Sequence, residues 1–146
     1  MEKKKINLME AAPDALKRIQ GLKGYLQKIS LSPLEQGLIM IRASQLNGCA
    51  YCLDMHTKQA RQHGESEERI YLLSAWKDSD LFSKKEKVML ALTEEITLIS
   101  NRGVWDETYE MAQKMLGDEV LAEVIMVIVI INAWNRIGIT TEMPKE

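Results

Sequence analysis

Several kinds of residue are scarce in this sequence, and each shortage excludes a class of protein. Only two of the 146 residues are cysteine, so the chain is not a disulfide-rich scaffold. The net charge is −2 and the basic residues are scattered, which leaves no electrostatic case for binding nucleic acid. The longest apolar run, residues 124–131, is much shorter than the about 20 residues that span a membrane. No apolar segment follows the lysines near the start, so we expect a soluble, cytoplasmic protein.

The rest of the composition is that of an ordinary globular domain. Hydrophobic residues make up 46% of the chain, which argues against disorder. A chain of this length can bury roughly two thirds of its surface, so residues 1–146 are expected to form a single domain without a stabilising metal or disulfide. In a reducing compartment, a lone pair of cysteines is more often catalytic or metal-binding than structural.

Capping residues and glycines predict an all-α fold, a compact bundle of six to seven helices. Ser32-Pro33-Leu34-Glu35 and Ser83-Lys84-Lys85-Glu86 both have the capping-box pattern that begins a helix. Gly48, Gly64 and Gly117 are expected to end helices. There is no alternating strand pattern and no repeat of helix pairs. The expected helices cover about residues 14–29, 32–47, 49–64, 66–76, 83–99, 106–117 and 118–137.

Residues 124–131 are the ambiguous element. Their β-branched side chains favour a strand, but the polar residues on both sides extend the segment to the length of a helix. A helix that is apolar all round must be covered on every side, and within a small domain a partner subunit is the expected cover for part of it. The sequence therefore predicts an oligomer with this helix near the interface.

Residues that carry chemistry gather in one stretch, Cys49-Ala-Tyr-Cys52-Leu-Asp-Met-His56. Neighbours three and four apart share one face of a helix, so both thiols and the imidazole are expected to converge. Cα atoms three apart on a helix are about 5 Å from each other, within the range of a disulfide. A thiol near a helix N-terminus has a lowered pKa, and His56 can take its proton or give one to a leaving oxygen.

This arrangement predicts a redox enzyme. A thiolate would attack the O–O bond of a peroxide and become a sulfenic acid, and the second thiol would condense with it to give a disulfide and water. An external dithiol would then reduce the pair.

Other interpretations of the same residues stay open. The two cysteines can be ordinary core residues, or ligands of a zinc site that has three local ligands and no obvious fourth. His63 lies about 10 Å beyond His56 along a continuous helix and cannot join that metal. A thioredoxin-type fold is discounted because a helix, not a strand, is expected before Cys49. Glu94 and Glu95 interrupt an apolar helix and either lie on the surface or supply a carboxylate that orients His56.

The stretch from Ile41 to Lys58, which includes Asn47-Gly48 and His56, resembles the core of the alkylhydroperoxidase D-like branch of the carboxymuconolactone decarboxylase family. Further matches at residues 71–76, 91–94 and 131–136 extend the resemblance over about residues 32–137. It implies an all-helical fold that assembles as trimers or hexamers. It also implies peroxidase or disulfide-reductase activity without haem, flavin or metal, with electrons supplied by a lipoyl-bearing protein or a thioredoxin-like dithiol.

By matching position, the resemblance implies that Cys52 is the peroxidatic thiol, Cys49 the resolving thiol and His56 the proton relay. Family members with a full relay carry a Glu twelve residues before the first cysteine, where this chain has Gly37. The missing carboxylate is expected to come from elsewhere, with Glu94 as the candidate, or to be absent. The decarboxylase branch generally lacks the cysteine pair, so decarboxylation is not expected.

Three functions follow from these observations. The first is a cytoplasmic thiol peroxidase of antioxidant type that acts on hydrogen peroxide or alkyl hydroperoxides. The second is a thiol–disulfide reductase or adaptor that does not reduce peroxide itself. The third is a non-catalytic oligomeric module whose cysteine pair senses redox state.

Overall fold

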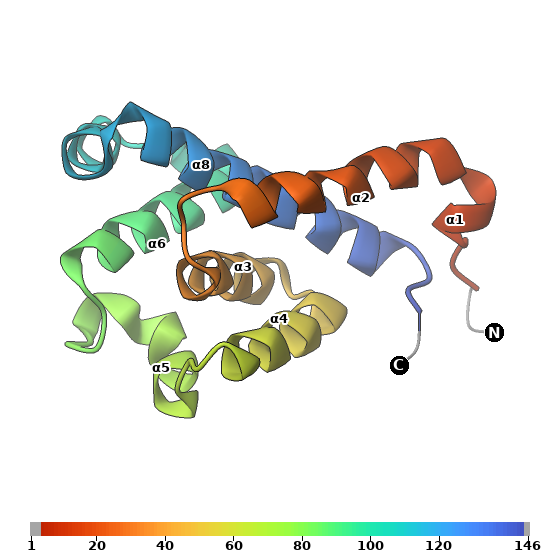
Figure 1. Ribbon diagram of the computed structural model, residues 1–146, viewed down its shortest axis with the longest axis horizontal. Coiled ribbons are helices and arrows are strands. Elements are labelled where there is room, and N and C mark those ends of the chain that lie inside the picture. Colours follow the sequence, from red (N-terminus) through yellow and green to blue (C-terminus); the bar gives the residue numbers. More distant parts are fainter. Residues whose placement is uncertain (1–3, 145–146) are drawn as a thin grey trace.

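Helices follow one another throughout residues 4–144, the part of the chain that the computed structural model describes (Figure 1). The predicted all-α fold is confirmed, with eight α-helices, one 3-10 helix and no strand in this part of the chain. In chain order the elements are α1 (Leu8–Ala11), α2 (Pro13–Lys28), α3 (Pro33–Asn47), α4 (Ala50–Gln62), α5 (Glu67–Leu72), η1 (Leu73–Asp78), α6 (Lys84–Thr97), α7 (Ile99–Arg102) and α8 (Asp106–Thr140).

Most helix ends lie where the sequence predicts them. Both capping boxes form, with Ser32 and Ser83 each accepting the backbone N–H three residues on. Gly48 ends α3 in the left-handed conformation, with φ 69°. Gly117 has φ 77° and ψ 163°, so it divides α8 into the two predicted helices.

The helix count differs from the predicted six to seven for local reasons. Helices α1 and α7 have only four residues each, which is too short for hydrophobic periodicity to reveal. The predicted helix at residues 66–76 begins as α5, capped by Ser66, and continues as the 3-10 turn η1 with a non-helical Ala75.

Helix α3 lies at the centre of the fold and packs against α4, α6 and α8 (Figure 1). Ile39 on one face is fully buried in a cluster with Met89 of α6 and Ile128 of α8. Leu38 on the other face is buried in a second cluster with Leu73 of η1. Burying such a side chain is worth about 1.5–3 kcal/mol relative to exposing it. The central position of α3 fixes the point from which α4 starts.

Helix α8 is covered mainly by its own chain. Val124, Val127 and Ile128 are fully buried in the first cluster, whereas Met126 and Val129 on the opposite side are 36% and 47% exposed. Helical packing thus accounts for the β-branched run without a strand. The exposed side is where a partner subunit would have to lie, and the oligomer remains a prediction.

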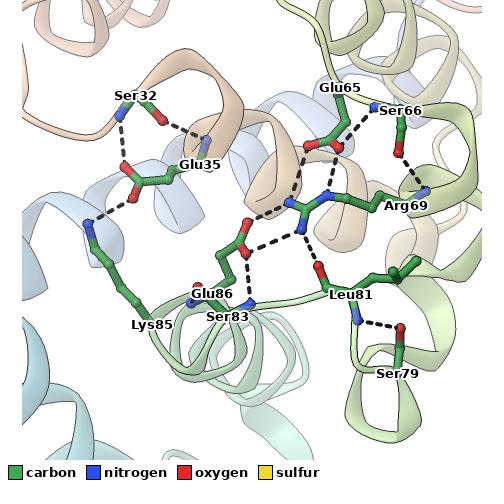
Figure 2. Close-up of polar contacts among 10 residues, drawn as sticks. All are labelled: Ser32, Glu35, Glu65, Ser66, Arg69, Ser79, Leu81, Ser83, Lys85 and Glu86. Atoms are coloured by element: carbon green, nitrogen blue, oxygen red, sulfur yellow. Dashed lines mark hydrogen bonds and ion pairs between the residues drawn. The ribbon is translucent and has the colours of Figure 1, made fainter.

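A cluster of ion pairs joins α5 to α6 on the side of the molecule away from α2 (Figures 1 and 2). Arg69 Nε donates to Glu65 Oε1 at 2.8 Å, and Nη2 donates to Glu86 Oε2 at 2.5 Å. The same guanidinium donates to the carbonyl of Leu81 and lies 4.8 Å from the ring centre of Phe82. Each guanidinium nitrogen of Arg69 donates to an acceptor. The cluster therefore fixes α5 against the start of α6.

Helix α2 is attached less tightly than the others. Leu16, Ile19, Leu22 and Leu26 form its apolar stripe, but Leu16 alone is buried. Leu26 packs against the first cluster near the end of the helix. The stripe therefore faces a space between α2 and the body of the protein. Within residues 4–144, no helix is both long and apolar enough to cross a bilayer.

Candidate active site

The turn between α3 and α4 brings the two cysteines together. Cys49 is the N-cap of α4, and its Sγ accepts the backbone N–H of Cys52 at 3.3 Å. The two residues form a disulfide, with their Cα atoms 5.3 Å apart. The prediction that the pair can close across the first turn of a helix is confirmed. Both sulfurs thus lie at the positive end of the α4 dipole, which favours a thiolate when the bond is reduced.

Both sulfurs are buried against the last turns of α8. Cys49 and Cys52 are each 1% exposed, and Cys52 Sγ lies 3.8 Å from the carbonyl oxygen of Trp134. A Cβ on Gly138 would stand 3.0 Å from Cys49 Sγ and 3.3 Å from Cys52 Sγ. Any reagent must therefore displace protein atoms, or enter through a small opening, before it reaches sulfur.

A chain of amides fixes α8 against the turn that carries the cysteines. Asn47 Nδ2 donates to Asn132 Oδ1 and to Asn135 Oδ1, each at 2.9 Å. Asn135 is fully buried and donates through Nδ2 to Ser44 Oγ at 2.9 Å. Asn132 donates to Thr97 Oγ1 at 3.0 Å. No described buried side-chain nitrogen or oxygen lacks a partner. The end of α3, just before the turn, is thus tied to α8, and Asn132 also ties α8 to α6.

His56 lies one turn beyond Cys52 on α4, and its surroundings differ from those of the sulfurs. Its side chain hydrogen-bonds with Gln59, and no described hydrogen bond joins it to either sulfur. Burial lowers the pKa of His56 from 6.5 to about 4, because desolvation outweighs the bond with Gln59. The imidazole is therefore neutral at pH 7 and can accept a proton.

A cavity of about 1210 Å³ lies beside His56, between α2 and the body formed by α3, α4 and α8. Its walls are largely apolar and include Met40, Met55, Trp134 and Ile137. Neither cysteine lines it. Trp134, which lines the cavity, also lies against Cys52 through its carbonyl oxygen, so the cavity is close to the reactive pair.

The structure does not bring Glu94 to His56. Glu94 Oε1 instead accepts Trp76 Nε1 at 2.5 Å and Arg42 Nε at 3.3 Å. Glu94 is therefore neither a free surface residue nor a hydrogen-bond partner of the imidazole. Glu95 accepts the backbone N–H of Trp105 at 2.7 Å.

Gly37, at the position where the resemblance implies a carboxylate, lines the same cavity as His56. A Cβ there would make ordinary contact with Ala60 Cβ at 3.6 Å, so a side chain fits. Glu35 lies two residues away in the capping box with Ser32 and pairs with Lys85 at 2.8 Å. The relay carboxylate is thus missing from a position that has room for it.

Sequence reasoning missed Gly138, which lies against both sulfurs, and Asn135, which fixes α8 to the segment before the turn. Residues 131–136 carry a family match, but nothing local indicates that this segment of α8 meets the turn before Cys49. In the part of the chain that is described, no three His, Cys, Asp or Glu side chains form a cluster that could hold a metal ion. His63 is an exposed residue that caps the end of α4, as its sequence position suggests.

Comparisons with known proteins identify the family and the fold. A model described as the carboxymuconolactone decarboxylase family matches residues 13–95. The uncharacterised protein YdfG of Bacillus subtilis is 42% identical over 135 residues, which cover 92% of each chain. A crystal structure from Agrobacterium tumefaciens, of a protein of unknown function named as a candidate antioxidant defence protein AhpD, is 36% identical. The match covers 99% of this chain and 100% of the Agrobacterium chain, with a TM-score of 0.90.

A second solved structure shows the fold alone. It is an uncharacterised peroxidase-related protein from Silicibacter, 23% identical, with a TM-score of 0.76 over 89% of this chain and 70% of its own.

Proposed function

The chain belongs to the carboxymuconolactone decarboxylase family, and on that premise we propose that it is a thiol-dependent peroxidase of antioxidant type. Its substrates would be hydrogen peroxide or alkyl hydroperoxides. The observation that carries this proposal is the Cys49–Cys52 pair, bonded across the first turn of α4 at the positive end of its dipole. The Agrobacterium relative, named as a candidate antioxidant defence protein, supports the same reading.

The first step would oxidise Cys52. Its thiolate attacks one oxygen of the peroxide, so that an S–O bond forms and the O–O bond breaks, leaving a sulfenic acid and an alkoxide or hydroxide. His56 is neutral at pH 7 and can take the thiol proton, then return it to the leaving oxygen. Because its pKa of about 4 makes it a weak base, this relay would be slower than one with a tuned imidazole.

The second and third steps would close and reopen the disulfide. The Cys49 thiol displaces the hydroxyl of the Cys52 sulfenic acid, giving the disulfide and water. An external dithiol, from a lipoyl-bearing or thioredoxin-like protein, then attacks the disulfide through its thiolate. It leaves as a disulfide itself and restores both thiols. No metal or organic cofactor takes part in this cycle.

Peroxide would reach the sulfurs from the cavity beside His56. Trp134 lines this cavity, and its carbonyl oxygen lies 3.8 Å from Cys52 Sγ, so the buried cysteines are close to the cavity wall. Its apolar walls suit an alkyl hydroperoxide, and α2, which forms one wall, is the least tightly packed long helix.

The test is the loss of free thiols from the reduced protein in stopped flow, with hydrogen peroxide and with an alkyl hydroperoxide. We expect Cys52→Ser to abolish rapid oxidation and Cys49→Ser to leave a sulfenic acid that dimedone traps. His56→Ala should slow oxidation by at most on the order of a hundredfold, the low end of what a proton relay contributes, because the imidazole is a weak base. His63→Ala removes the exposed histidine that caps α4 and also lines the cavity, so it should slow oxidation far less than His56→Ala. Rapid oxidation of Cys52→Ser would disprove the assignment.

Gly37 favours a second candidate, a thiol–disulfide reductase that does not reduce peroxide itself. With no carboxylate at position 37, exchange with dihydrolipoamide would be fast while peroxide reduction would be negligible. Gly37→Glu tests this choice, because a Cβ at that position is in ordinary contact. If the chain is a peroxidase with an incomplete relay, Gly37→Glu should raise the rate with peroxide and leave the exchange rate unchanged. If the chain is a reductase only, both rates should stay as they are.

A further inference from the structure

The backbone conformation at residue 138 does not require a glycine. It lies inside α8, two residues before the helix ends, and it is not among the glycines with positive φ. A glycine inside a helix weakens that helix relative to alanine. Another requirement must therefore explain the residue at this position.

The space beside Gly138 is occupied by the two sulfurs. A Cβ at this position would stand 3.0 Å from Cys49 Sγ and 3.3 Å from Cys52 Sγ, distances at which a neighbour has to move. Gly21 and Gly24, the two helical glycines of α2, have nothing within 4 Å of such a Cβ. Close contact with the reactive pair is thus particular to Gly138.

Neither side of this contact can move freely. On one side, α8 is fixed to the turn before Cys49 through Asn135, which bonds with Asn47 and Ser44 at 2.9 Å. On the other side, both cysteines are 1% exposed, so they are enclosed by protein. A methyl group at position 138 would therefore crowd the sulfurs instead of displacing the helix.

We propose that Gly138 is a positioning residue whose missing side chain leaves the space that the sulfurs need in order to change chemical state. This proposal rests on the proposed function and extends it to a residue of α8. Bonded sulfurs approach each other more closely than two thiols can, so reduction requires more room. A sulfenic acid on Cys52 adds an oxygen atom and requires still more. The disulfide is the smallest of the three states.

Gly138→Ala should therefore favour the disulfide. In equilibrium with dithiothreitol, we expect the ratio of disulfide to dithiol to rise about tenfold over wild type, which corresponds to ~1.4 kcal/mol. The rate of thiol loss on adding hydrogen peroxide should fall by at least about tenfold, because the sulfenic acid is the most crowded state. Gly24→Ala is the matched control and should leave both quantities within about twofold of wild type.

A second variant separates crowding from a general defect of the helix. Cys49→Ala removes the sulfur nearest to position 138, so that the added methyl group has room. Oxidation of Cys52 by one equivalent of peroxide should then be equally fast in Cys49→Ala and in Cys49→Ala/Gly138→Ala. A purely structural role for Gly138 would slow the double variant as much as the single one.

Each outcome decides the matter. If Gly138→Ala does not fold but Cys49→Ala/Gly138→Ala does, the space belongs to the sulfurs and the proposal is supported. If neither folds, or if Gly138→Ala matches Gly24→Ala in both measurements, the proposal is wrong. If wild type does not react with peroxide, the proposed peroxidase function fails. The dithiothreitol equilibrium then tests the role of Gly138 by itself.

Discussion

The ion-pair cluster around Arg69 and the disulfide site at the start of α4 differ in what burial does to their ionisable groups. In the cluster, the hydrogen bonds that Arg69 donates to Glu86 and Glu65 outweigh desolvation and raise the pKa of Arg69. Burial would raise the pKa of Glu86, but bonds with Arg69 and Ser83 lower it overall. At the disulfide site, desolvation is opposed only by Gln59, and the pKa of His56 falls to about 4.

The polar groups of the cluster therefore stabilise the fold, whereas His56 is suited to take part in chemistry. A charge that is paired on every side stays charged and holds two helices together, but it cannot give up or take a proton at neutral pH. An imidazole with one neutral partner stays uncharged at neutral pH, so it can accept a proton, although only as a weak base. We expect substitutions in the cluster to change stability and leave thiol chemistry unaltered, and substitutions at the disulfide site to change both.

The largest effect on stability is expected from Arg69→Met. Glu65, whose side chain is 4% exposed, would be left buried without its cation. Breaking a buried pair in this way lowers the free energy of unfolding by about 3–5 kcal/mol. Urea denaturation at pH 7 measures the loss, and the rate of thiol oxidation by peroxide should stay at the wild-type value.

Lys85→Met is the control for this variant. Lys85 pairs with Glu35 in the same region, but the lysine is 46% exposed (Figure 2). Its loss should lower stability by at most about 1 kcal/mol. If both variants lost the same free energy of unfolding, burial would not explain the difference between the Arg69–Glu65 and Lys85–Glu35 pairs.

The next largest effect concerns the pH dependence of stability. The unfolded chain takes up a proton on His56 below pH 6.5, whereas the folded chain does so only near pH 4. The free energy of unfolding should therefore fall as the pH drops from 6.5 to 4, by up to ~3 kcal/mol from this group. His56→Leu should remove that part of the decline, as measured by urea denaturation at several pH values. A slope that is unchanged in His56→Leu would show that the imidazole is protonated in the folded chain.

A smaller loss of stability is expected from Asn135→Ala. If this variant changed stability alone, the disulfide site would not differ from the ion-pair cluster in the way proposed above. Asn47 and Ser44 would lose a partner in a buried place, which should lower the free energy of unfolding by about 1–3 kcal/mol. Because the same bonds fix α8 against the sulfurs, the rate of thiol oxidation should change as well. Asn101→Ala, at an exposed position of α7, is the control and should alter neither.

The smallest effect is expected from Ser83→Ala. Loss of the N-cap of α6 should lower stability by about 1 kcal/mol, measured by thermal unfolding. Glu86 would keep its ion pair with Arg69, so the cluster should remain closed. A loss as large as that of Arg69→Met would show that the cap, not the ion pair, holds α5 to α6.

The parts of the fold that are fixed by neighbours in sequence were predictable. Ser32 and Ser83 begin helices through contacts within three residues, and Gly117 divides α8 through its own φ. The first turn of α4 likewise determines that Cys49 and Cys52 can bond. Each of these features depends on local geometry that residue type and spacing specify.

The parts that depend on tertiary packing were not predictable. Gly138 acquires its meaning only from the sulfurs that lie against it, and Asn135 only from Ser44 and Asn47. Glu94 shows the opposite error, because its place in an apolar helix suggested a surface position or a bond with His56. Arg42 and Trp76 reach it from other elements.

Cys49 is at once a reactive group and the first acceptor of a helix, since its sulfur receives the backbone N–H of Cys52. Because a thiolate is a stronger acceptor than a disulfide sulfur, the hydrogen bond from the Cys52 N–H changes in strength when the pair is reduced. Amide hydrogen exchange at Cys52, followed by NMR, should therefore report the oxidation state of the pair. The exchange rate of this one amide proton would therefore follow turnover without an added fluorescent label.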